Sequence, residues 1–212
     1  MGQYTKIDDA SSHFQVVKWT GNTTTPRDIT HTGNSNLKPD IHWAKNLESD
    51  GTDHRLYDSN RGLGTETSLQ PNSNAAEATG TTYGILSHFL TNGFTTAAGG
   101  SNDDNYNENN SDFVAFSWKV NGGTTASNTD GDVTSTVQVN ANAGVSIVTW
   151  AGANTNNKTI GHGLGQSPDM IIIRNRTRTE DWGVFHREMG GPVDRFRSNS
   201  GGLRLNETDA VN

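Results

Sequence analysis

Two stretches of this chain repeat the same residue types at a fixed spacing, and no other feature constrains its fold as strongly. Apolar residues recur 131 residues apart in three pairs, which are Val16 and Ile147, Val17 and Val148, and Trp19 and Trp150. His31 and His162 keep this spacing, and a Pro-Asp pair follows in each stretch, at residues 39–40 and 168–169. Self-similarity over so long a period predicts two copies of one module in tandem.

The repeat also sets the expected domain boundaries. We expect a polar lead-in at residues 1–10, a first module at 11–123, a linker at 124–143 and a second, partial module at 144–212. Residues 205–210 correspond to 70–75, so nothing in the second copy matches residues 78–121 of the first. A module without its closing strand exposes a sheet edge. We therefore expect either that the chain is cut short or that another subunit supplies the missing strand.

The composition favours an all-β fold. Only 30% of the residues are hydrophobic, and the 24 glycines lie among many Asn, Ser and Thr residues. Short runs of Thr, Val, Ile and aromatic residues are bounded by Gly, Asn and Asp, which is typical of strands joined by turns. Because long connections separate the short strands, we expect β-sandwich modules of the jelly-roll or Greek-key type rather than barrels.

Local patterns predict individual elements. Residues 112–120, DFVAFSWKV, alternate in type along an expected strand. The set expected to face the core consists of Val114, Phe116, Trp118 and Val120. Asp50-Gly51 is a strong hairpin signal between two strands. Residues 84–94 are compatible with one short helical turn that Asn92-Gly93 closes, and a strand is expected to start at Phe94.

Charge and residue types exclude several function classes. The chain carries 23 acidic and 16 basic residues without a basic run, which gives no support to binding of nucleic acid or of an anionic membrane surface. It contains no cysteine, so disulfides, thiolate metal sites and a cysteine nucleophile are excluded. No stretch approaches the ~20 apolar residues of a membrane span, and residues 1–10 lack the features of a signal peptide. We expect no cofactor.

The string GHGLG at residues 161–165 is the most conspicuous short motif. A phosphate-binding loop would need a Lys after it or a helix, and here the next expected element is a strand. We therefore interpret the string as a turn whose glycines supply positive φ angles while His162 caps or packs it. The seven histidines of the chain lack the H-x-x-x-H and H-E-x-x-H spacings of zinc sites.

Acidic residues are weak candidates for metal binding or catalysis. Asp103, Asp104 and Glu108 lie in a long polar loop, and calcium takes several oxygen ligands at alternate positions of such loops. The loop lacks a full D-x-[DN]-x-[DN]-G frame, so a solvated turn is favoured. Paired carboxylates could also serve glycoside hydrolysis. Asp40 and Asp169 recur, but each follows Pro at a strand start, where Asp commonly organises a turn.

The tryptophans divide into expected core residues and one candidate ligand contact. Trp19 and Trp150 recur beside pairs of β-branched residues, which predicts burial. Trp182 aligns with His54 and is therefore expected to be the most exposed. If an aromatic residue contacts a ligand such as a sugar ring, we expect it to be Trp182.

Long strings of the sequence resemble repeat modules in large virion structural or tail-fibre-like proteins of marine bacteriophages. The resemblance covers nearly the whole chain and is carried by YTKIDDASSHFQ, NSNLKPDIHWAKN, DFVAFSWKVNGGTTASNTDGDVTSTVQVNANAGVSIVTWAGA and TIGHGLGQSPDMIIIRNR. It implies a component of the phage tail or capsid surface that is assembled in the host cytoplasm. The implied partners are other virion proteins and further copies of the chain, because such fibres are commonly trimeric.

Three functional hypotheses follow from these observations. The first is a non-enzymatic tail-fibre or spike module that contributes to host attachment, where repeated weak sites gain avidity. The second is a carbohydrate-binding, lectin-like β-sandwich, with or without calcium, whose ligand is a host surface glycan. The third and least favoured is a glycan-degrading enzyme, since no G-x-S-x-G motif and no rigid acid–base pair is recognisable.

Overall fold

Regular structure in this chain consists almost entirely of β-strands. The computed structural model describes residues 7–49, 51–63, 67–77, 82–99, 104–153, 155–189 and 203–208. These residues form thirteen strands and two short 3₁₀ helices, η1 (Ala10–Ser12) and η2 (Arg187–Met189). Every pairing between two of these strands is antiparallel. The expectation of an all-β, sandwich-type fold is confirmed.

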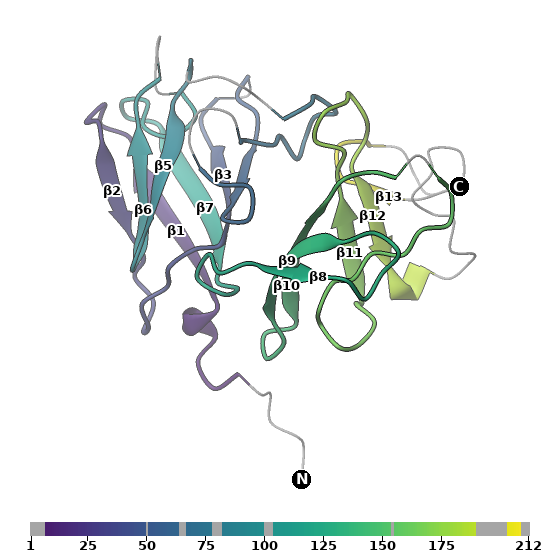
Figure 1. Ribbon diagram of the computed structural model, residues 1–212. Coiled ribbons are helices and arrows are strands. Elements are labelled where there is room, and N and C mark those ends of the chain that lie inside the picture. Colours follow the sequence, from purple (N-terminus) through teal and green to yellow (C-terminus); the bar gives the residue numbers. More distant parts are fainter. Residues whose placement is uncertain are drawn as a thin grey trace.

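The first seven strands form two sheets that face each other (Figure 1). One sheet has the order β1 (Phe14–Thr20), β7 (Asp112–Trp118), β3 (Ile41–Asn46), β4 (Arg55–Asp58). The other has the order β2 (Arg27–Thr30), β6 (Gly93–Ala97), β5 (Ile85–Leu90). We call these strands and their loops, residues 10–123, the N-terminal sandwich.

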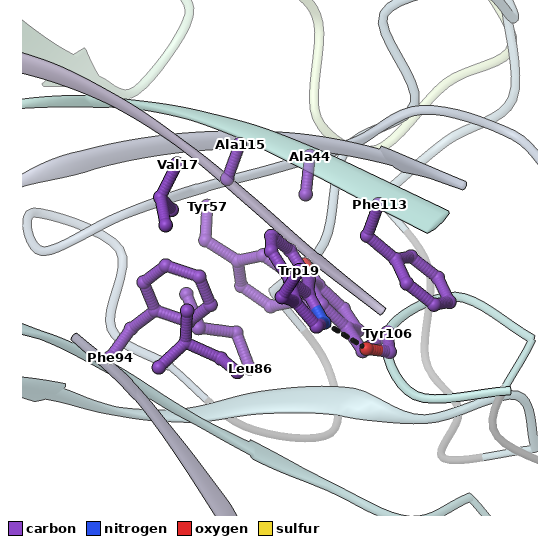
Figure 2. Packing of buried hydrophobic residues seen from close by; sticks show 10 residues of the cluster. Val17, Trp19, Ala44, Tyr57, Leu86, Phe94, Tyr106, Phe113 and Ala115 are labelled. Atoms are coloured by element: carbon purple, nitrogen blue, oxygen red, sulfur yellow. Dashed lines mark hydrogen bonds between the residues drawn. The ribbon is translucent and has the colours of Figure 1, made fainter. Parts of the chain in front are cut away.

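Aromatic side chains from both sheets fill the core of the N-terminal sandwich (Figure 2). The Trp19 ring stacks on Phe113 at 5.3 Å and meets the edge of Phe94, from the opposite sheet, at 5.5 Å between ring centroids. Its indole N–H donates to the backbone oxygen of Tyr106 at 2.8 Å. Tyr106 comes from the loop before β7 and is fully buried. A buried indole thus keeps both its apolar contacts and its hydrogen bond.

Strand β7 faces the core with the opposite side from the one expected. Phe113, Ala115 and Ser117 are fully buried, whereas Phe116 is 37% exposed. The prediction that the set containing Phe116 faces the core is therefore wrong. Both sets of this strand are largely apolar, and the outward set packs against aromatic residues of its own sheet, such as Phe14. Alternation alone cannot choose between two apolar faces.

Two turns indicated by the sequence had different outcomes. Strands β3 and β4 pair as a hairpin, which confirms the turn expected near Gly51, although Asp50 itself lies outside the described residues. The helical turn with which residues 84–94 are compatible does not form, because β5 forms there and pairs with β6. Gly93 begins β6 with φ 127°, and a Cβ at this position would lie 2.0 Å from the backbone oxygen of Ile29. This close approach between β2 and β6 requires glycine.

The C-terminal region, residues 124–208, contains two further three-stranded sheets (Figure 1). Their orders are β10 (Val145–Trp150), β9 (Ser135–Asn140), β8 (Ala126–Asn128) and β11 (Met170–Ile173), β12 (Gly183–His186), β13 (Leu203–Arg204). The segment expected as a linker, residues 124–143, therefore carries β8 and β9. Strand β9 is the central strand of its sheet because it pairs with both β8 and β10.

Two asparagines, Asn72 and Asn206, make the same hydrogen bonds in the two parts of the chain. The Asn72 side chain accepts from the His54 N–H at 2.9 Å and donates to Asp53 at 2.9 Å. The Asn206 side chain accepts from the Trp182 N–H at 2.8 Å and donates to Asp181 at 3.0 Å. Each Asn thus fastens a returning segment to the start of β4 or β12.

The two Pro-Asp positions also share a backbone contact. Ser59 N–H donates to the Asp40 backbone oxygen at 2.8 Å, and Arg187 N–H donates to the Asp169 backbone oxygen at 2.9 Å. The buried Asp40 carboxylate accepts in addition from the Ser59 hydroxyl and from the N–H groups of Val120 and Gly122, at 2.7–2.8 Å. The expected turn-organising role of Asp40 is confirmed.

Candidate functional site

The acidic loop before β7 holds structure together. Asp103 lies outside the described residues. The Glu108 carboxylate accepts from the Asn46 amide at 3.1 Å and from the Ser111 hydroxyl at 2.9 Å. The Asn46 amide also donates to the backbone oxygen of Asp104 at 2.8 Å. These bonds fasten the loop to the end of β3 and hold Tyr106 in the core. Within the described ranges, no three His, Asp or Glu side chains converge on a point that could hold a metal ion.

The GHGLG string forms the expected turn. Gly163 and Gly165 have φ angles of 75° and 73°, and the Leu164 N–H donates to the His162 ring nitrogen at 3.2 Å. A Cβ at Gly161 would lie 1.7 Å from the Asn128 side-chain oxygen, so this glycine serves close packing. An open hollow of about 410 Å³ lies here, lined by Asp130, Gly161, His162, Gly163, Gly165 and Gln166. None of these lining residues is Leu, Ile, Val, Phe, Tyr or Trp, the residue types that line most small-molecule sites.

Trp182, the expected ligand contact, is buried between the two parts of the chain. Only 3% of the residue is exposed, so the expectation of an exposed ring is wrong. Its indole N–H donates to the backbone oxygens of Gln70 at 3.0 Å and Ser73 at 3.1 Å. The loop at residues 70–77 of the N-terminal sandwich lies against β12 at this point. Trp182 therefore connects two parts of the protein and has little surface left for a ligand.

Arg174 completes the same contact from the end of β11. Its guanidinium donates to the backbone oxygens of Asn74 at 2.7 Å and Ala75 at 2.5 Å, and it lies 5.8 Å from the centre of the Trp182 ring. It also caps its own loop by donating to the backbone oxygens of Arg178 and Glu180. Burial lowers the pKa of this guanidinium, and the neighbouring carboxylates oppose that shift.

Ion pairs extend the contact along residues 70–77. Glu77 N–H donates to the Arg176 backbone oxygen at 2.8 Å, and the two side chains pair at 2.7 Å. The other Glu77 carboxylate oxygen binds Arg61, which in turn pairs with Asp58 at 2.5 Å. The Arg61 side chain is 3% exposed and that of Glu77 12%, so solvent screens their pairing little. We call this set, residues 70–77 against 174–182, the Trp182 contact.

A second attachment joins the N-terminal sandwich to β9. The buried Gln138 side chain donates to the Ser59 hydroxyl at 2.9 Å and accepts from the Gly123 N–H at 3.1 Å. The Asn60 amide donates to the Thr136 backbone oxygen at 3.1 Å. We call this set, residues 59–60 and 123 against 136–138, the Gln138 contact. Neither contact could be predicted from sequence motifs. The Trp182 contact joins residues about 100 positions apart, and the Gln138 contact joins Gln138 to Ser59 and Gly123, which share no motif with it.

An aromatic patch lies on the outer face of the β1–β7 pair. Phe14 stacks against Phe116 with 6.5 Å between ring centroids, and Trp118 lies 4.9 Å from Phe14. Phe14 and Phe116 are each 37% exposed, and the neighbouring Val16 is 45% exposed. We call these four residues the β1–β7 aromatic face. A sequence signal for it existed, since both alternating sets of residues 112–118 are apolar.

Comparison with known proteins places the chain in one family. Neither the curated proteins nor the solved structures include a match to it. In the part of the chain that the structure describes, no helix has the length and apolar character needed to cross a membrane. Residues 9–212 match the family described as a domain of unknown function, DUF7483. Because this match covers nearly all of the sequence, the protein belongs to the DUF7483 family.

Proposed function

We propose that this protein is a non-enzymatic structural component of a phage virion, in a tail fibre or spike that contributes to host attachment. The observation that carries the proposal is the pair of attachments between the N-terminal sandwich and the C-terminal region. A fibre must keep its successive β-rich parts in a fixed orientation, and buried side chains that join them at two places do this. The virion part of the proposal is supported by the sequence resemblance.

The Trp182 contact is suited to such a role because it recognises backbone. Trp182 and Arg174 donate to four backbone oxygens of residues 70–75, and no described side chain of that loop is needed for those bonds. Contacts to backbone tolerate substitution in the loop. A repeated protein with varying surface residues could keep this joint in every copy.

The described carboxylates support a non-enzymatic role. Asp40 is buried, and four hydrogen bonds occupy its carboxylate and backbone oxygens. Its counterpart Asp169 pairs with Arg187 on the surface. A glycosidase needs one carboxyl group as acid and a second as base or nucleophile on either side of the bond that is cut, whereas the Asp40 and Asp169 side chains bind the residues that follow β4 and β12. Purified protein is therefore expected to release no reducing ends from host polysaccharide.

The test is the composition of the virion itself. Mass spectrometry of gradient-purified particles from the phage that encodes the chain is expected to detect it in several copies per particle. Gold-labelled antibodies against the purified protein are expected to decorate tail fibres or spikes in electron micrographs. Absence of the chain from intact particles, together with its presence in the infected-cell lysate, would refute the proposal.

A second candidate is carbohydrate binding through the β1–β7 aromatic face. Rings exposed on a flat sheet can stack against the apolar face of a sugar, as aromatic side chains do at many interfaces. On this hypothesis a glycan array gives binding that Phe116→Ala abolishes and that Tyr83→Ala, another exposed aromatic, leaves unchanged. Arrays run with calcium and with a chelator separate a calcium-assisted site from a purely aromatic one. No binding under either condition removes this candidate.

A further inference from the structure

Four strands of the C-terminal region, β8, β10, β11 and β13, lie at sheet ends and have an outer edge without a strand partner among the described residues. The edges of β10 and β11 are the two that correspond to paired edges in the N-terminal sandwich. Strand β10 lies at one end of the sheet β10-β9-β8, and β11 lies at one end of the sheet β11-β12-β13. An open strand edge exposes a row of backbone N–H and C=O groups that readily pair with another chain segment. In the N-terminal sandwich, the corresponding edges of β1 and β3 are both paired with β7.

Strand β7 closes the corresponding edges in the N-terminal sandwich. It lies between β1 and β3 and pairs antiparallel with both along its full length. The repeat aligns β10 with β1, β11 with β3 and β12 with β4. The described residues of the C-terminal region contain counterparts of these three strands and no counterpart of β7.

The open edge of β11 corresponds to the edge of β3 that pairs with β7. The Asp40 backbone oxygen binds the residue after β4, and the Asp169 backbone oxygen binds the residue after β12 in the same way. The β11–β12 pair therefore uses the same edge as the β3–β4 pair. Since backbone groups alternate between the two edges of a strand, those of Met170 and Ile172 point to the open side.

The open edge of β10 also matches the edge that β1 turns toward β7. His13 and Gly21 bond to residues flanking β7, so the odd-numbered residues of β1 face that strand. Their counterparts in β10 are Ser146, Val148 and Trp150. Asn140 and Val145 are the Cα partners that close the β9–β10 hairpin after a four-residue turn. We infer that this closing pair is a hydrogen-bonded one, so that Val145 faces β9. Ser146, Val148 and Trp150 consequently face away from β9.

Asp169 carries a further mark of the same site. Asp40 uses its Oδ1 atom for the Ser59 hydroxyl and its Oδ2 atom for the N–H groups of the residues after β7. Asp169 uses Oδ1 for the aligned residue, Arg187, at 2.6 Å. Its side chain is 62% exposed, and Oδ2 has no hydrogen bond to a described residue. This oxygen is the one that would receive the amides following an incoming strand.

The exposed large apolar residues of the C-terminal region all lie on β10 and β11 among the described residues. Trp150 is 39% exposed where Trp19 is 8% exposed, and Ile171 is 37% exposed where His42 is fully buried. Ile172 and Met170 are exposed to a similar or larger degree. Contiguous apolar exposure of this kind marks a surface that another polypeptide covers.

We propose that the open edges of β10 and β11 accept an extended strand of the β7 type. The strand runs antiparallel to both edges, alternates aromatic and small residues as Asp112–Trp118 do, and continues into a turn whose N–H groups bind Asp169 Oδ2. The occupant is therefore a nearly uncharged polypeptide segment and neither a glycan nor an ion. The inference does not depend on the virion proposal, because it rests on the correspondence between the two parts of this chain.

A synthetic peptide tests the site directly. The probe is residues 111–123 of this chain, fluorescently labelled and titrated against the full-length protein, and saturable one-to-one binding is expected. A peptide carrying Ala115→Pro and Phe116→Pro is the matched control, since it removes one N–H toward each edge. Amide hydrogen exchange is expected to slow at Ser146, Val148, Trp150 and Ile172 on binding. No binding, or slowing confined to other residues, overturns the proposal.

Variants of the protein separate the site from general adhesion of an apolar peptide. Asp169→Ala is expected to weaken peptide binding about tenfold, the effect of losing charge-assisted hydrogen bonds to two amides. Asp8→Ala, an exposed carboxylate on the polar segment before η1, is expected to leave binding unchanged. Equal binding by both variants and by the wild type contradicts the assigned role of Asp169.

Sedimentation velocity distinguishes the alternative occupant, a second copy of the chain. If the chain dimerises through these edges, the peptide is expected to dissociate the dimer, because both compete for one site. A dimer that persists at saturating peptide, with the same amides protected, shows that a second copy closes the edges and overturns the proposal for a β7-type strand.

Discussion

Trp19 and Trp150 occupy matching positions in the repeat and have different surroundings. Both lie near the end of a strand and follow the same pattern of apolar residues, but Trp19 is 8% exposed and Trp150 is 39% exposed. Phe94, Phe113 and Tyr106 surround Trp19, and all three come from the segment 85–118, which has no counterpart in the C-terminal region. The same strand sequence thus yields a core residue only where a second sheet and its loop are present.

Lys45 and Arg174 give a second comparison, within aligned loops. Lys45 donates to the backbone oxygens of Ser49 at 2.9 Å and Thr52 at 2.7 Å. Arg174 makes the equivalent bonds in its own loop and uses the rest of its guanidinium to reach residues 74 and 75. Because the arginine side chain is longer and forked, it caps its own loop and also contributes to the Trp182 contact. Arg174 in place of Lys45, together with Trp182 in place of His54, therefore lets this loop of the C-terminal region bind residues 70–75.

The largest expected effect separates the two tryptophans. Trp19→Ala is expected to lower the free energy of unfolding by about 3–5 kcal/mol, because it opens a cavity in a packed core. Trp150→Ala is expected to cost about 1 kcal/mol, since its ring is already partly in water. Urea denaturation followed by circular dichroism measures both. Equal costs would show that Trp150 is covered in solution.

The next prediction concerns pH and the N-terminal core alone. Burial lowers the pKa of His42 from 6.5 to about 3, and the nearby His31 has its pKa lowered by burial as well. Below pH 6.5, His42 therefore binds a proton in the unfolded chain and stays neutral in the folded core. Stability is complete above that pH and falls by about 1.4 kcal/mol per pH unit below it for His42, reaching about 2 kcal/mol at pH 5.

His42→Leu is expected to reduce this slope, and the aligned residue Ile171 has no proton to bind. Exposed His88→Ala serves as the control and is expected to keep the wild-type slope. Urea midpoints between pH 5 and pH 8 measure the effect. If His42→Leu retains the full loss at pH 5, another group causes the pH dependence.

Exchanging Arg174 and Lys45 for each other's residue type tests the Trp182 contact. Arg174→Lys restores the residue type of the N-terminal loop, keeps the cap and loses the bonds to residues 74 and 75, at an expected cost of about 1 kcal/mol. The matched exchange Lys45→Arg is expected to change the free energy of unfolding by less than about 0.5 kcal/mol. Urea denaturation of both variants checks this. A reversed order would mean that Arg174 acts within its own loop only.

The smallest expected effect tests where the two parts are alike. Asn72→Ala and Asn206→Ala each remove one side chain that bonds a backbone N–H and a carboxylate. Each is expected to cost about 1 kcal/mol by thermal or urea denaturation, and the two values are expected to agree. The control is Asn34→Ala, an exposed residue. Losses of unfolding free energy that differ severalfold would show that the Asn72 and Asn206 hydrogen bonds are unequal in strength.

The sequence predicted the fold class and several local features, because these depend on neighbouring residues. The hairpin of β3 and β4, the turn at Gly163 and the role of Asp40 follow from residue types within a few positions. The direction in which β7 faces did not follow, because both of its faces are apolar. Which face of β7 is buried depends on Trp19 and Phe94, which pack on the side of Phe113 and lie outside the strand's own sequence.

The candidate site was missed for a similar physical reason. Alignment with His54 favoured an exposed Trp182, whereas its burial depends on residues 70–77, more than 100 positions away. Two substitutions in one aligned loop, Lys45 against Arg174 and His54 against Trp182, were the available signal. A large aromatic residue in place of a polar one, next to a new arginine, indicates a contact between two parts of a protein as readily as it indicates a ligand-binding site.

Two separated attachments, the Trp182 contact and the Gln138 contact, determine how the molecule responds to tension. A single contact would act as a pivot, and a pull on one part would peel it open one bond at a time. With two anchors the load is divided, and the parts can turn relative to each other only about the line that joins the two contacts unless one contact breaks. A chain of such parts would transmit a pull along its length while resisting torsion.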